Sequence, residues 1–181
     1  MSAPRVLGVD LSLTSTGLAD GARSWLLKTT GHRGDSLASR ATRLAGIRDG
    51  VLAAAAGAAL VVVEGPSLGQ ARQSGVHDRS GAWWHVVGAL LAAGIPVAEV
   101  PPASLKRYAV GKGNASKDQV LVAAVRRLPG FDGGNDQADA SWLAAMALDV
   151  LTGVSHVPES HRAALTAVRW PLPLDTAAGA A

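Results

Sequence analysis

The sequence contains no cysteine. A disulfide-stabilised fold and a thiolate metal site are therefore both excluded, which is consistent with a reducing compartment. Long hydrophobic runs are also missing, because the longest, residues 51–63, is too short and too rich in alanine and glycine to span a membrane. The first residues show no signal-peptide pattern. We therefore expect a protein of the bacterial cytoplasm, or of a host cytoplasm if a phage encodes it, with no membrane partner.

Aromatic residues are scarce, at 4% of the chain, but the apolar fraction of 48% is typical of a globular protein. A length of 181 residues suits one domain with a sizeable core. The net charge of +3 and the isoelectric point near 9.8 permit a nucleic-acid partner without requiring one. The bias toward alanine, glycine, valine and arginine indicates a GC-rich bacterial or phage genome.

Short apolar runs bounded by turn residues predict strands, and apolar residues at helical spacing predict helices. We expect strands at 6–10, 17–19, 24–28, 60–64 and 96–100, and helices at 35–56, 81–93, 101–106, 117–127, 136–151 and 158–168. The polar segment 67–80 is interpreted as an exposed loop. This order predicts an α/β fold, in which a three-strand antiparallel meander and parallel strands form one mixed sheet with helices on both faces. Residues 1–151 would form this domain, and residues 152–181 a C-terminal helical extension with a frayed tail.

Four acids are notable for where they lie. Asp10 and Glu64 each end a strand whose preceding residues are apolar, so neighbouring strands would bring both carboxylates to one edge of the sheet. Asp136 and Asp139 are three residues apart and share one face at the start of a helix. Any one of these acids has an ordinary structural explanation, such as a favourable helix dipole. All four together favour a site for two divalent cations, which need hard oxygen ligands and no His or Cys.

The lysines are clustered. Only four occur in the chain, and Lys106, Lys112 and Lys117 lie within twelve residues of one another. Most lysines are simply solvated surface charges. Here the cluster spans a glycine-containing loop whose backbone N–H groups can bind an anion, which favours phosphate binding. The loop is not a nucleotide P-loop, because that spacing of glycine, lysine and hydroxyl residues is absent, and we expect no nucleotide cofactor.

In these features the sequence resembles the RuvC family of Holliday junction resolvases, which have the RNase H-like fold. The resemblance runs over residues 5–151 and includes Asp10 with Thr16-Gly17, Val62-Val63-Glu64, Lys106 with the block 109–120, and Asp136-Gln137-Ala138-Asp139-Ala140. It implies that Asp10, Glu64, Asp136 and Asp139 are catalytic and hold two Mg²⁺ or Mn²⁺ ions. It also implies that water attacks the scissile phosphate in line, leaving 5′-phosphate and 3′-hydroxyl ends, with Lys106 and Lys117 stabilising the charge that develops.

The resemblance further implies a homodimer acting on branched DNA. Basic and polar residues of the loops and helices are candidates for DNA contacts, above all Lys106, Arg107, Lys112, Asn114, Lys117, Arg72 and Arg79, and in addition Arg40, Arg43, Arg126 and Arg127. One departure concerns the aromatic residue that the family commonly places shortly after the glutamate. Residues 65–68 contain no ring, and Trp83 and Trp84 are the nearest candidates, although such a pair on an apolar helix is more typical of a core or dimer interface.

The predicted function is a metal-dependent, structure-selective endodeoxyribonuclease for Holliday junctions or other branched DNA. One alternative keeps the fold and changes the substrate to flaps, forks or RNA–DNA hybrids. A second alternative is an ATP-binding protein of the actin and sugar-kinase superfamily, which also begins with a strand, an aspartate and a Ser/Thr turn. A third is a DNA-binding module without catalytic activity.

Overall fold

The computed structural model describes residues 3–66 and 75–171, and within these ranges a single sheet has the strand order β3-β2-β1-β4-β5. Neighbouring strands β1, β2 and β3 pair antiparallel, whereas β4 pairs parallel with both β1 and β5. The strands are β1 Val6–Asp10, β2 Ser15–Ala19, β3 Ser24–Lys28, β4 Leu60–Glu64 and β5 Val97–Val100. The predicted mixed sheet, with its meander and its parallel strands, is confirmed.

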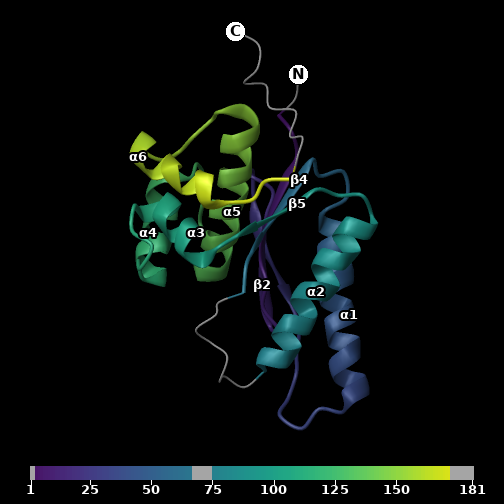
Figure 1. Ribbon diagram of the computed structural model, residues 1–181. Coiled ribbons are helices and arrows are strands. Elements are labelled where there is room, and N and C mark those ends of the chain that lie inside the picture. Colours follow the sequence, from purple (N-terminus) through teal and green to yellow (C-terminus); the bar gives the residue numbers. More distant parts are fainter. Residues whose placement is uncertain (1–2, 67–74, 172–181) are drawn as a thin grey trace.

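Helices cover both faces of the sheet, with α1 and α2 on one side and α3, α4 and α5 on the other (Figure 1). Helix α4 begins as predicted, because the side chain of Ser116 accepts from the Gln119 amide and the Gln119 side chain accepts from the Ser116 amide. The helices are α1 Leu37–Ala54, α2 Val76–Ala92, α3 Pro102–Val110, α4 Lys117–Arg127, α5 Asn135–Thr152, α6 Glu159–Arg162 and the 3₁₀ turn η2 Ala163–Ala167.

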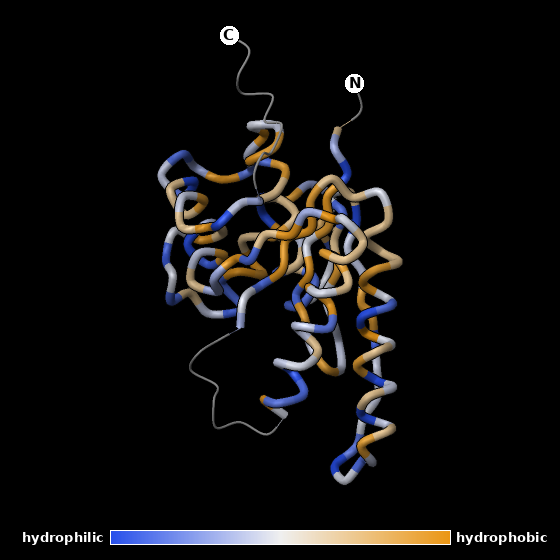
Figure 2. Tube along the Cα trace, turned by 45° about the vertical axis from the view of Figure 1, so that its right-hand side comes forward, coloured by the Kyte–Doolittle hydropathy of each residue, from blue (hydrophilic) through white to orange (hydrophobic). Residues whose placement is uncertain are grey.

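The alternation of side chains along the strands divides the core into two halves. Leu7, Val9 and Val63 lie in the half that faces α1 and α2, while Val6 and Val62 lie in the half that faces α5. Figure 2 shows hydrophobic colours gathered at the centre of the molecule and hydrophilic colours on its peripheral loops. None of the helices in the described ranges is long and apolar enough to cross a membrane.

The expected exposed loop over residues 67–80 is wrong at its C-terminal end, because α2 begins at Val76 instead of residue 81. Residues 67–74, which include Arg72, lie outside the described part of the chain. Gly75 adopts a positive φ of 81° immediately before the helix. The charged residue that looked like a loop signal, Asp78, is buried and ion-paired with Arg40 and Arg43 of α1. This pairing joins the first turn of α2 to α1.

The helix expected at 158–168 divides into α6 and η2, and the chain then becomes extended. Arg169 forms an antiparallel bridge with Glu99 of β5, which covers part of this edge strand. Ala164 and Val168 are buried in the same half of the core as α5. The described part of the C-terminal extension therefore packs on the body of the fold. Residues 172–181 lie outside the described chain.

Candidate active site

Two strand ends place the first two acids. Val9 of β1 pairs with Val63 of β4 in a parallel register, so Asp10 and Glu64 follow next to each other at the carboxyl ends of adjacent strands. Their side chains project toward α5, because they continue the alternation that turns Val6 and Val62 to that face. Asp10 is only 9% exposed. A carboxylate so buried is costly unless something compensates its charge.

Two glycines bring the other two acids to the same place. A Cβ at Gly8 would overlap the Ala140 carbonyl oxygen, and a Cβ at Gly17 would overlap that of Asp136. Helix α5 therefore lies directly on the backbone of β1 and β2, as only glycine allows at these two positions. Because Asp136 and Asp139 occupy the first turns of this helix, the close approach delivers them to the end of β1. These glycines were missed as site residues in the sequence, although a glycine inside a strand is a signal for close backbone approach.

Electrostatics show that the acids share one environment. Burial, followed by the charges of Glu64 and Asp139, raises the pKa of Asp10 to about 8. Burial and the charge of Asp139 likewise raise the pKa of Glu64 to about 7. The pKa of Asp139 is raised mainly by burial, and the charge of Asp136 adds to it. The four carboxylates predicted from the sequence therefore interact with one another at one edge of the sheet.

Two of the predicted lysines lie within electrostatic reach of this cluster. The charge of Lys117 lowers the pKa values of Asp10, Glu64 and Asp139, which offsets part of the effect of burial. Lys106 acts in the same direction on Glu64 and Asp139. Lys117 is the first residue of α4 and is exposed, whereas Lys106 lies half-buried in α3. The positive charges that act on the carboxylates therefore come from α3 and α4.

In the part of the chain that the structure describes, no three Asp, Glu, His or Cys side chains are arranged to hold a metal ion together as they stand. The chemistry of the four acids nevertheless fits divalent cations, because all their donors are carboxylate oxygens and their mutual repulsion calls for positive charge.

Comparison with known proteins agrees with this geometry. No protein-family model matches the chain. The crossover junction endodeoxyribonuclease RuvC of Acidovorax sp. is 35% identical over 77% of this chain and 82% of its own length. RuvC of Halorhodospira halophila is 36% identical over 75% and 84%. The chain belongs to the RuvC family.

The RuvC structure of Thermus thermophilus has a TM-score of 0.61 at 25% identity, covering 80% of this chain and 93% of that one. The same RuvC in complex with Holliday junction substrate shares the fold, with a TM-score of 0.60 at 23% identity over the same shares of the two chains.

In the present RuvC-family chain, the glycine loop, residues 111–114, connects α3 to α4. Gly111 has a φ of 88° and ends α3, and its N–H donates to the Arg107 carbonyl at 2.8 Å. Positive φ is a conformation that glycine adopts without strain, which explains the residue at this position. Lys112 and Asn114 are exposed on the loop that follows. The predicted DNA-contacting residues Lys106, Arg107, Lys112, Asn114 and Lys117 thus belong to one segment of the chain. The lysines at its two ends, Lys106 and Lys117, act electrostatically on the carboxylates.

Other basic residues proposed for DNA contacts have different surroundings. The guanidinium of Arg40 pairs with Asp78, and Arg43 Nη2 lies 3.5 Å from Asp78 Oδ2. Arg127 donates to the Ala109 carbonyl at 2.8 Å. Arg79 is half-buried on α2, while Arg107 and Arg126 are exposed. Arg40, Arg43 and Arg127 therefore have partners within the protein. The DNA contacts of all these basic residues stay predictions.

The two tryptophans of α2 differ in their surroundings. Trp83 is half-buried, and its Nε1 donates to the backbone carbonyl of Glu64 at 3.0 Å. This hydrogen bond holds the end of β4, which carries the candidate ligand Glu64. The sequence did not suggest this role for Trp83. Trp84 packs edge-to-face on Trp83, with ring centroids 4.8 Å apart, yet is 68% exposed.

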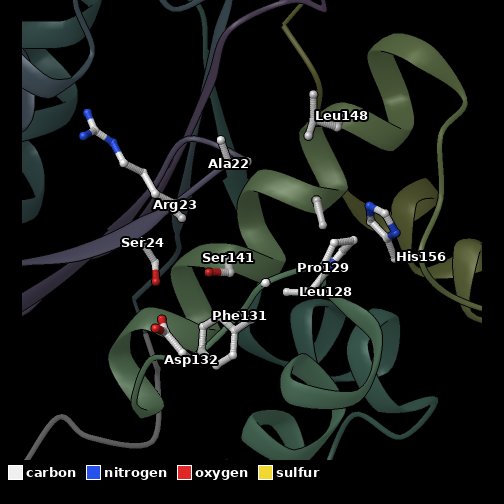
Figure 3. A pocket seen from close by; sticks show the side chains of 14 residues that line it. Ala22, Arg23, Ser24, Leu128, Pro129, Phe131, Asp132, Ser141, Leu148 and His156 are labelled. Atoms are coloured by element: carbon white, nitrogen blue, oxygen red, sulfur yellow. The ribbon is translucent and has the colours of Figure 1, made fainter.

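A separate pocket of about 150 Å³ lies between the β2–β3 turn, the α4–α5 loop and α5 (Figure 3). Its lining includes Ser24, Phe131, Ser141 and His156. None of the four carboxylates lines it. This pocket is therefore not part of the candidate active site at the ends of the strands.

Proposed function

We propose that this protein is a metal-dependent endonuclease that cuts Holliday junctions. The observation that supports the proposal most is the convergence of Asp10, Glu64 and Asp139 near the carboxyl ends of β1 and β4. Burial raises the pKa values of Asp10 and Glu64, and the charge of Asp139 raises both further. The relatives that match most of the chain are named crossover junction endodeoxyribonucleases, and a homologous fold occurs in complex with a Holliday junction. The family relationship favours this function over nucleotide binding.

In this proposal Asp10, Glu64, Asp136 and Asp139 hold two Mg²⁺ or Mn²⁺ ions. Bound divalent ions would lower the pKa of water and neutralise charge on the phosphate. During hydrolysis a water oxygen forms a bond to phosphorus, and the bond between phosphorus and the 3′ oxygen breaks in line with it. The products are a 5′-phosphate and a 3′-hydroxyl. Lys106 and Lys117 stand where a cation would stabilise the negative charge that develops on the phosphoryl oxygens.

The contacts to the rest of the DNA would come from the segment between α3 and α4. Arg107, Lys112 and Asn114 are exposed there, between the two lysines whose charges act on the acids. Lysine and arginine bind phosphates without reading the base sequence, so these residues would set affinity and register. Arg72, which the structure does not describe, and Arg79 are further candidates on the segment that follows Glu64.

A homodimer would let two such sites cut two strands of one junction. Trp84, Gly88 and Leu91 support this part of the proposal because they are exposed and lie on one stripe of α2. Trp84 and Leu91 are 68% and 57% exposed, so the stripe brings two large apolar side chains together on the surface, as interaction sites do. Since Trp83 of the same helix contacts Glu64, a contact through this stripe would fix the two active sites relative to each other.

The function is tested with purified protein on a synthetic four-way junction, with and without Mg²⁺. We expect cleavage only with Mg²⁺, and we expect Asp10→Asn to reduce the rate by about 10³-fold or more while junction binding persists. Asp49→Asn is the matched control, because Asp49 lies exposed on α1 and pairs with Arg48 at 2.8 Å. Unchanged cutting by the Asp10 variant would contradict the proposal. A Y-fork, a flap and an RNA–DNA hybrid, assayed in parallel, distinguish junction cleavage from the alternative substrates.

A further inference from the structure

The carboxyl end of α3 is held by side chains from distant parts of the chain. The last carbonyls of a helix have no partner within the helix and must be satisfied elsewhere. Here the Tyr108 carbonyl lies 3.0 Å from His161 Nδ1, and the Ala109 carbonyl accepts from Arg127 Nη1 at 2.8 Å. Only Val110 separates these two residues from the glycine loop. The loop is therefore anchored at its first end by α6 and α4.

The ring of His161 also lies against the loop itself. A Cβ on Gly111 would stand 2.7 Å from His161 Nε2, so the imidazole occupies the space beside this glycine. A carbonyl oxygen can only accept a hydrogen bond, so Nδ1 of His161 carries the hydrogen in this contact. His161 thereby fixes both the carbonyl before the loop and the backbone at its first residue.

A buried carboxylate fixes α6 in turn. Asp149 of α5 is 1% exposed and accepts from Arg162 through Nη2 at 2.8 Å and Nε at 3.1 Å. Its other oxygen accepts from the Tyr108 hydroxyl at 2.8 Å. One carboxylate thus joins α3, α5 and α6, and a buried charge satisfied by three donors holds a definite geometry. Because His161 is next to Arg162 in α6, this network also fixes the position of His161.

We propose that α6 is a positioning element for DNA binding, and that His161 holds the loop 111–114 in the conformation that presents Lys112 and Asn114 to a DNA phosphate. The inference rests on the proposed junction binding. His161 itself touches no substrate in this arrangement and acts through Tyr108 and Gly111. Without it, the loop must be ordered when DNA binds, and that ordering lowers affinity.

The first test replaces His161. We expect His161→Ala to raise the Kd for a four-way junction about fivefold, which corresponds to one lost hydrogen bond, and to leave kcat at saturating junction unchanged. His161→Asn should restore affinity, because the Asn amide nitrogen sits where Nδ1 of histidine does and can donate to the Tyr108 carbonyl. Val168→Ala is the control, since it removes buried contacts from the same C-terminal segment without touching the loop, and its Kd should match that of the wild type.

A second measurement needs no DNA. The amides of Gly111 and Ala115 donate within this region, to the carbonyls of Arg107 and Lys112. Their hydrogen exchange should accelerate in His161→Ala and not in Val168→Ala. Lys112→Ala should also weaken binding less in the His161→Ala background than in the wild type, because a disordered loop already uses Lys112 poorly.

Unchanged exchange and unchanged Kd in His161→Ala would overturn the inference. Equal losses in His161→Ala and Val168→Ala would overturn it as well, because the effect would then be general destabilisation. If the wild-type protein neither binds nor cuts junctions, the proposed function fails instead. The exchange of the loop amides then still decides whether His161 holds the loop.

Discussion

Asp10 has a charge that the protein alone compensates poorly. Burial removes it from water, Glu64 and Asp139 repel it, and Lys117 offsets only part of these effects, so its pKa is raised to about 8. Both Asp10 and Glu64 therefore bind protons in the folded protein at pH values where they would be ionised in the unfolded chain. The same arrangement that disfavours the ionised site without metal favours a divalent cation once it is present.

This imbalance predicts how stability depends on pH. Between the unfolded pKa near 4 and the folded values of about 8 and 7, the folded state holds more protons than the unfolded state. The free energy of unfolding should therefore decrease as pH rises through this window, by at most about 1.4 kcal/mol per pH unit for each group. Urea denaturation in a metal chelator from pH 5 to 8 measures the decrease, and added Mg²⁺ should oppose it.

Asp10→Asn should make that decrease shallower, because one of the two proton-binding groups is gone. Asp49→Asn serves as the control, since Arg48 lowers the pKa of exposed Asp49 and its removal does not flatten the profile. Identical pH profiles for the wild type and Asp10→Asn would contradict the assignment of a raised pKa to this residue.

At the scale of elements, the site depends on how closely α5 approaches the sheet. Gly17 of β2 lies beneath the Asp136 carbonyl, and Gly8 of β1 beneath that of Ala140. A methyl group at either position has no space without a shift of the helix. Since α5 provides two of the four acids, a shift of the helix moves them away from Asp10 and Glu64.

Gly17→Ala should therefore reduce junction cleavage strongly and destabilise the fold by about 1–3 kcal/mol, as overpacking of a close contact does. Gly46→Ala in α1 is the matched control, because no atom lies within 4 Å of its Cβ position. In a helix interior that replacement should stabilise by up to about 1 kcal/mol and leave cleavage unchanged. Cleavage kinetics and urea denaturation of both variants provide the check. Full activity in Gly17→Ala would show that the helix position is not critical.

The elements that the sequence predicted well are those whose signals are local. The strand ending in Asp10 and the helix capped by Ser116 both follow from residues within one short window. The start of α2 could not be predicted in this way, because His77, Asp78 and Arg79 resemble a loop until Asp78 is paired with Arg40 of α1. Helix α5, expected from residue 136, begins one residue earlier at Asn135, and Gly134 takes the cap position.

The residues of the candidate site also divide into those that local sequence predicts and those that it does not. The acids could be chosen from the sequence because each occupies a recognisable end of a strand or helix. Their supports could not, since the hydrogen bond from Trp83 to Glu64 and the network of Asp149 with Arg162 join residues far apart in the chain. Such contacts depend on tertiary packing that no local pattern specifies.

At the scale of the whole molecule, the exposed stripe of α2 is the surface through which we propose that two copies meet. Val86 and Leu90 of this helix are buried against the sheet, while Trp84 and Leu91 lie on the opposite side. The 3.6-residue period of a helix keeps positions 84, 88 and 91 in one row, and Gly88 between the large side chains lets two helices approach closely. A two-fold contact along this row is self-complementary, as a symmetric dimer requires.

If two copies meet along this row, as proposed, Trp84→Glu should weaken dimerisation by about 2 kcal/mol or more, because a charge replaces a large apolar side chain in the contact. His85→Glu is the control, since His85 is also exposed on α2 but is rotated about 100° away from the row. Light scattering across a dilution series measures the dissociation constant. On a plasmid with a cruciform, a dimer that cuts both strands gives linear DNA, whereas a monomer gives nicked circles. Linear product and an unchanged dissociation constant for Trp84→Glu would place the interface on another surface.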